Sequence, residues 1–241
     1  MLDPTSPPRA DIGSDHDERW PAEMSLRRSA EHLRRKAEPH IRDADANAAA
    51  GRYGAALSAN TTAVQVVRRL RKVEPENRRH LAVLGSLYYN QALLLEKNGR
   101  GLDGITAARR AVLYYESLDP TRRGERSVSE AVTDDALIAG DGDPIDAARL
   151  IAHLADSRAR LARLLGSHGH PDHHRDRELR RFDLDPRLTL RHEINVLDAQ
   201  ACLTYKALVE CSRYTEADYE RVLQESGEGL GRYHARFPND R

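Results

Sequence analysis

Residues 84–120, LGSLYYNQALLLEKNGRGLDGITAARRAVLYYESLDP, decide the fold. Steps of three and four residues place one set of side chains on a single helix face before the Gly99 turn, and a second set follows the same rule after it. These sets are Leu84, Tyr88, Gln91 and Leu95, then Ile105, Ala108, Val112 and Tyr115. The stretch therefore predicts two helices joined by a tight turn.

The same turn recurs elsewhere in the chain. The segment GRYGAAL at 51–57 takes the place that GRGLDGI has at 99–105, and SRYTEAD at 212–218 echoes both. Small residues fall where the paired helices must approach closely, because a larger side chain would push them apart. They are Ala92, Gly104 and Ala111 in one unit and Ala44, Ala56 and Ala63 in the other. No segment alternates as a strand does, so we predict an all-α fold of about eight or nine helices.

These hairpins resemble the tetratricopeptide repeat, clearly over residues 84–120 and more weakly over 40–76 and 198–225. The distance from Gly51 to Gly99 exceeds the standard repeat of about 34 residues. The helices are longer, as in the kinesin-light-chain type and in long repeats of actinobacterial regulatory proteins. An Arg- and Ala-rich composition also suggests a high-GC actinobacterial origin. The resemblance implies an array of antiparallel helical hairpins.

The resemblance also implies which side chains meet a partner. In such arrays the first helix of each hairpin lines the concave face. On the best-matching unit the outward positions would be Tyr89, Asn90, Leu93, Glu96 and Lys97. Tyrosine and asparagine can bind an extended peptide by stacking and by hydrogen bonding to its backbone. The alternative is that Tyr89 packs against the next hairpin.

Composition divides the chain into a leader and one helical domain. Residues 1–19 carry three prolines and few large apolar groups, so we expect a disordered leader followed by a single helical-repeat domain over 20–241. Residues 119–143 read as a long connection with a short helix near Glu130, and they could act as a hinge. Exposed terminal hairpins would also permit a homo-oligomer.

Charge and targeting signals limit the expected partners and the expected cellular location. The chain has 38 basic and 38 acidic groups, so no dominant attraction to nucleic acid is expected, and the basic runs at 34–36 and 68–72 are interpreted as solvated faces. The first residues lack a charged start followed by an apolar stretch, so no secretory signal is expected, and no apolar run has membrane-spanning length. Cys202 and Cys211 are too far apart on one helix to form a mutual disulfide. We therefore expect a cytoplasmic protein with reduced cysteines.

A histidine-rich segment carries the strongest chemical signal. His168, His170, Asp172 and His173 reproduce the spacing H-x-H-x-D-H of the metallo-β-lactamase superfamily, in which such residues hold zinc. The context differs, because here the motif follows a helix rather than a strand. One alternative is an exposed loop that binds zinc, either to stabilise the structure or adventitiously. The other, which we favour, is a polar turn that binds no metal.

The sequence thus predicts a non-catalytic adaptor or regulator that binds a protein or peptide and needs no cofactor. Two other functions stay open. One is a metal-dependent enzyme or metal-responsive protein that uses residues 168–174. The other is a small-ligand sensor whose helices close around an effector between residues 84 and 211.

Overall fold

The structure is a computed structural model that describes residues 15–119, 121, 127–133, 146–169 and 186–238, and every element within these ranges is a helix or a turn. The helices are α1 (Asp15–Ala49), α2 (Tyr53–Val73), α3 (Arg79–Lys97), α4 (Gly101–Glu116), α5 (Val128–Thr133), α6 (Ala147–His168), α7 (Pro186–Glu210) and α8 (Glu216–Arg236). The predicted all-α fold is confirmed for the described residues. The predicted count of eight or nine helices stays a prediction, because parts of the chain lie outside these ranges.

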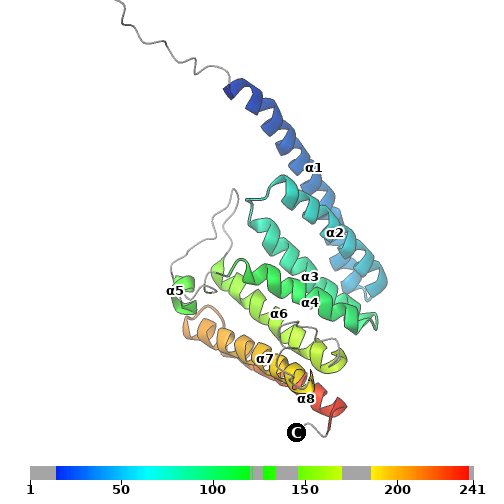
Figure 1. Cartoon of the computed structure of the whole chain (residues 1–241), viewed down its shortest axis with the longest axis vertical. Coiled ribbons are helices and arrows are strands. Elements are labelled where there is room, and N and C mark those ends of the chain that lie inside the picture. Colours follow the sequence, from blue (N-terminus) through cyan, green and yellow to red (C-terminus); the bar gives the residue numbers. More distant parts are fainter. Residues whose placement is uncertain (1–14, 120, 122–126, 134–145, 170–185, 239–241) are drawn as a thin grey trace, which may run out of the picture.

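The helices pack one after another as a continuous array (Figure 1). Helix α2 lies between α1 and α3, and α4 lies between α3 and α6. Helices α6, α7 and α8 all contact one another and close the array at its C-terminal end. This packing of sequence neighbours is compatible with a helical-repeat protein.

The three echoing turns of the sequence share one backbone geometry. Gly51, Gly99 and Ser212 all adopt a left-handed conformation, with φ of 72°, 74° and 57°. In each turn the next residue donates its N–H to a carbonyl five residues earlier, as Arg100 does to Leu95 at 2.8 Å. This pattern satisfies the last carbonyls of the preceding helix. The sequence repeat therefore corresponds to a structural repeat of the helix C-terminus.

Small residues lie at the close helix contacts, as predicted. Ala92, Ala111, Ala56 and Ala63 are fully buried. A Cβ added to Gly104 would come 3.3 Å from the carbonyl oxygen of Ala92, so α3 and α4 touch through their backbones at this point. The close approach fixes the spacing of this hairpin.

The C-terminal end of the array depends on a glycine contact. A Cβ on Gly166 of α6 would overlap the carbonyl oxygen of Gly229 on α8. The two helices therefore cross with their backbones in contact. The start of α8 is fixed by Thr215 and Asp218, which form a capping box.

Several sequence predictions fall partly outside the described residues. Residues 15–19 form part of α1, while residues 1–14 are not described, so the leader over 1–19 stays a prediction. Helix α5 contains Glu130, where a short helix was expected, but most of the predicted hinge at 119–143 lies outside these ranges. No described helix has both the length and the apolar character that crossing a membrane requires.

Candidate partner-binding site

The predicted partner-binding residues lie on α3. Tyr89, Asn90, Leu93 and Glu96 are half-buried, and Lys97 is exposed. Tyr89 and Glu96 contact α6, so the structure brings these two together. Within the described part of the chain, Asn90 and Lys97 form no side-chain hydrogen bond or ion pair, and they stay beside the site rather than in it.

Glu96 is the centre of a cluster that joins three helices. Its Oε2 atom lies 3.1 Å from Nη1 of Arg160 and 3.0 Å from Nη2 of Arg163, both on α6. Its Oε1 atom lies 3.8 Å from Nη1 of Arg232 on α8. Arg160 also donates from Nη2 to the Tyr89 hydroxyl at 3.3 Å and lies over the Tyr89 ring, 5.1 Å from its centroid. We call these five residues the Glu96 cluster.

The Glu96 cluster holds more positive than negative charge. The side chains of Arg160, Arg163 and Glu96 are only 13 %, 19 % and 18 % exposed, so two guanidinium groups share one carboxylate in a largely dry setting. Their Nε atoms are buried and have no hydrogen-bond partner. A buried charge is costly unless an opposite charge compensates it. One guanidinium therefore lacks a full counter-charge.

Arg232 gives solvent access to this cluster. Its side chain is 43 % exposed, and it bonds Glu228 at 3.0 Å and the hydroxyl of Ser167 at 2.9 Å. It is thus the member that a ligand in solution reaches first. Guanidinium groups bind carboxylates through two parallel N–H donors, so the cluster can accept a carboxylate or a peptide carbonyl.

Sequence reasoning missed the arginine half of the site. On α6, a helix rich in buried Ala and Leu, the side chain of Arg158 is largely buried and pairs with Glu116 of α4 at 3.2 Å. Arg160 and Arg163 follow two and five residues later in the same helix. Three arginines within six residues, on a helix otherwise rich in Ala and Leu, were the sequence signal that could have identified this half of the site.

A second polar network ties α6, α7 and α8 together near their other ends. The Tyr205 hydroxyl donates to Oδ1 of Asp156 at 2.9 Å, and Arg221 lies 3.5 Å from the same oxygen. Burial, followed by the nearby Asp156 carboxylate, raises the pKa of Tyr205 well above its ordinary value. The phenol therefore stays neutral at physiological pH and acts as a hydrogen-bond donor. The network holds the three helices in place.

Asp198 on α7 has an unusual environment. It is half-buried, and its Oδ1 atom has no hydrogen-bond partner. Burial raises the pKa of this carboxyl group to about 7. Cys202, one helical turn later, contacts the hydroxyl of Ser226 on α8 at 3.0 Å, and both cysteines of the chain are free thiols.

Of the four candidate zinc ligands in the histidine-rich segment, only His168 lies within the described residues. His168 ends α6, and its ring packs so closely on Gly101 that a Cβ there would overlap the ring. His170, Asp172 and His173 lie outside the described residues, so the zinc prediction is not tested. Among the residues that the structure describes, no group of three or more metal-binding side chains is present.

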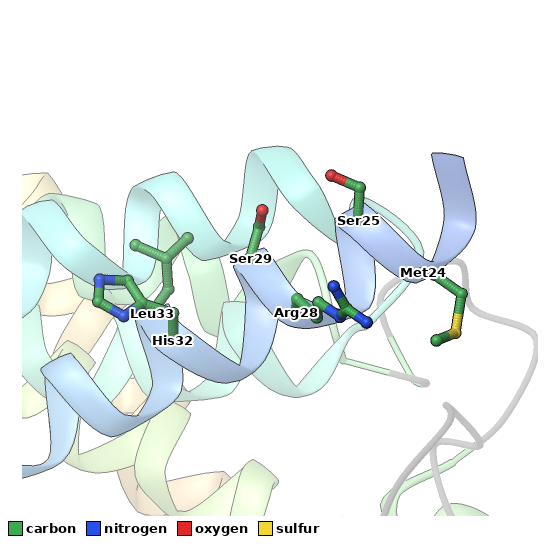
Figure 2. A pocket seen from close by; sticks show the side chains of 6 residues that line it. All are labelled: Met24, Ser25, Arg28, Ser29, His32 and Leu33. Atoms are coloured by element: carbon green, nitrogen blue, oxygen red, sulfur yellow. The ribbon is translucent and has the colours of Figure 1, made fainter. Parts of the chain in front are cut away.

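A hollow of about 670 Å³ lies along the first half of α1 (Figure 2). Its described lining comes from that one helix: Met24, Ser25, Arg28, Ser29, His32 and Leu33. Side chains spread along one helix do not converge on a bound group as those of a ligand site do. The Glu96 cluster, which joins three helices, is the better candidate.

Comparisons with protein-family models, with curated proteins and with solved structures gave no match for this chain. The function is therefore inferred from the chemistry of the Glu96 cluster.

Proposed function

We propose that this protein is a non-catalytic adaptor or regulator that binds a protein or peptide on the surface formed by α3, α6 and α8. In this proposal the chain is a tetratricopeptide-like array, and these three helices line its concave face. The Glu96 cluster is the observation that supports it, since its members come from all three helices.

The cluster suits recognition of a partner for two reasons. Its guanidinium groups are held in place by Glu96 and Tyr89, so little conformational entropy is lost when they bind a second acceptor. Their incomplete charge compensation favours a partner that brings a carboxylate or several carbonyl oxygens. Asn90 and Lys97 border the cluster on α3 and would extend the contact along a peptide.

The proposal can be tested by site-specific crosslinking in the native cell extract. A photoreactive amino acid is placed at Lys97, beside the cluster, and in a second sample at Ser58, which is exposed on α2. We expect a discrete crosslinked partner from Lys97 that is absent from Ser58. Identical products from both positions would refute a partner site on α3.

Two substitutions then test the cluster itself. Arg163→Gln should weaken binding of the purified partner by about tenfold or more, because it removes a charge-assisted contact. Tyr89→Phe removes only the hydroxyl that orients Arg160 and should weaken binding less. Arg42→Gln, on the exposed side of α1, is the matched control and should have no effect. Unchanged binding in Arg163→Gln with an unchanged melting temperature would exclude the cluster.

A further inference from the structure

Several basic side chains around the C-terminal part of α2 lack an ion pair. Some arginines in other places pair with carboxylates, as Arg34 does with Glu74 and Arg109 with Glu193. Five exposed basic residues, three on α2, one just before α3 and one on α4, form no ion pair with any described residue: Arg68, Arg71, Lys72, Arg78 and Arg110. Glu74, the nearest acidic residue to follow along the chain, is already engaged by Arg34 and His80. We call these five residues the basic ridge.

The fold brings the ridge together from three helices. Tyr88 of α3 and Tyr114 of α4 stack with their ring centroids 5.6 Å apart. The guanidinium of Arg71 lies 5.9 Å from the Tyr114 centroid, and that of Arg110 lies 5.4 Å from the Tyr88 centroid. Arg78, just before α3, reaches the carbonyl oxygen of Ser117 at the end of α4. Helices α2, α3 and α4 are neighbours in the array (Figure 1).

The tyrosine pair prepares two of these arginines for binding. Stacking occupies the flat face of a guanidinium and leaves its N–H edge free to donate. Arg71 and Arg110 are therefore held in position with their donors unused. Arg68 and Lys72 lie within one turn of Arg71 on the exposed side of α2. Two of the five exposed positive charges are therefore held in place.

We propose that the basic ridge binds the phosphate backbone of nucleic acid without sequence preference. Phosphate binding depends on the density of arginine and lysine, and the ridge supplies five such side chains. Of the two glutamates between Lys72 and Arg78, Glu74 is already paired with Arg34 and His80. A folded protein partner would instead require aromatic or apolar anchors, and the two tyrosines are already packed against each other. Their occupied faces also leave no ring free to stack on bases, so the bases are not read.

The zero net charge of the whole chain does not oppose this binding. Net charge governs long-range attraction, whereas the ridge acts locally at contact distance. The inference is independent of the proposed function, because the ridge shares no residue with the Glu96 cluster.

Fluorescence anisotropy with a labelled duplex of about 20 base pairs and with a single strand of equal length tests the proposal. We expect a Kd between about 10⁻⁶ and 10⁻⁴ M at physiological salt, the range of non-specific binding. Five phosphate contacts predict a slope of about −4 to −5 for log K against log salt concentration on the duplex. Scrambling the sequence should leave the affinity unchanged.

The double variant Arg71→Gln, Arg110→Gln removes two contacts. Its slope should become shallower by about two, and its affinity at about 50 mM salt should fall tenfold or more. The double variant Arg35→Gln, Arg42→Gln makes the same change in net charge on α1, where both arginines pair with glutamates, and should bind like the wild type.

Three results would overturn the proposal. One is the absence of saturable binding to either nucleic acid at low salt. Another is an equal loss of affinity in both double variants, which would show that only net charge matters. The last is binding of polyglutamate or anionic lipid vesicles, but not of nucleic acid, that Arg71→Gln abolishes.

Discussion

The buried carboxyl group of Asp198 makes a testable contribution to the pH dependence of stability. Burial raises its pKa to about 7 in the folded protein, whereas the unfolded chain has a value near 3.8. Between these two values the folded protein holds a proton that the unfolded chain has lost. The free energy of unfolding therefore falls as pH rises through this window, and the full cost is present above about pH 7.

The size of this cost follows from the pKa difference. At about 1.4 kcal/mol for each unit of pKa, the whole pKa difference would lower the free energy of unfolding by about 4 kcal/mol. Because Asp198 is only half-buried, solvent screening reduces the expected cost to about 1 to 3 kcal/mol. The substitution Asp198→Asn replaces the carboxyl group by a neutral amide of the same shape and should therefore remove this cost. In a chain of this length, each kcal/mol raises the melting temperature by roughly 2 to 4 °C.

Urea unfolding of the wild type and of Asp198→Asn at about pH 5 and about pH 8.5 measures the effect. We expect a small advantage of the variant at the lower pH, which already lies inside this window, and a larger advantage at the higher pH. Comparing the two proteins cancels groups that titrate in both, such as His153, whose pKa burial lowers. Asp45→Asn, at an exposed position on α1, is the control. A variant with the same advantage at both pH values would refute the reasoning.

Two further predictions concern glycine positions and turns. Gly166→Ala should lower the free energy of unfolding by about 2 kcal/mol or more, because its Cβ would overlap the Gly229 carbonyl. Gly231→Ala, on α8 with open space around it, should stabilise the protein by up to about 1 kcal/mol, and thermal melting of both compares them directly. Ser212→Gly should also stabilise by about 0.5 to 1 kcal/mol, since serine at φ 57° is strained; a lower midpoint in chemical denaturation would contradict this.

The sequence predicted the local parts of this structure well. The positions of Gly51 and Gly99 in their turns, and of Ala92 and Gly104 at a close contact, follow from spacing along a single hairpin. Such features depend on residues only a few positions apart. Their geometry is set before any distant contact forms, and a periodic pattern can therefore reveal it.

The functional surface was harder to predict because its halves are far apart in the chain. Tyr89 and Glu96 were identified from one helix, but Arg160 and Arg232 come from helices 60 residues or more downstream. Nothing in the spacing of a single hairpin shows which later helix it will face. The basic run at 68–72 was likewise interpreted as a solvated face, since the stacked tyrosines that organise Arg71 belong to other helices.

The shared geometry of the three turns has a consequence for how the chain folds. A turn closed by its own backbone hydrogen bonds brings adjacent helices together over a short loop, which costs little chain entropy. The α1–α2, α3–α4 and α7–α8 hairpins should therefore form early. The contact of Gly166 with Gly229 spans more than sixty residues and must wait until both helices exist. Docking of the α7–α8 hairpin on α6 is then the late, slow step, and it is the event that completes the arginine cluster around Glu96.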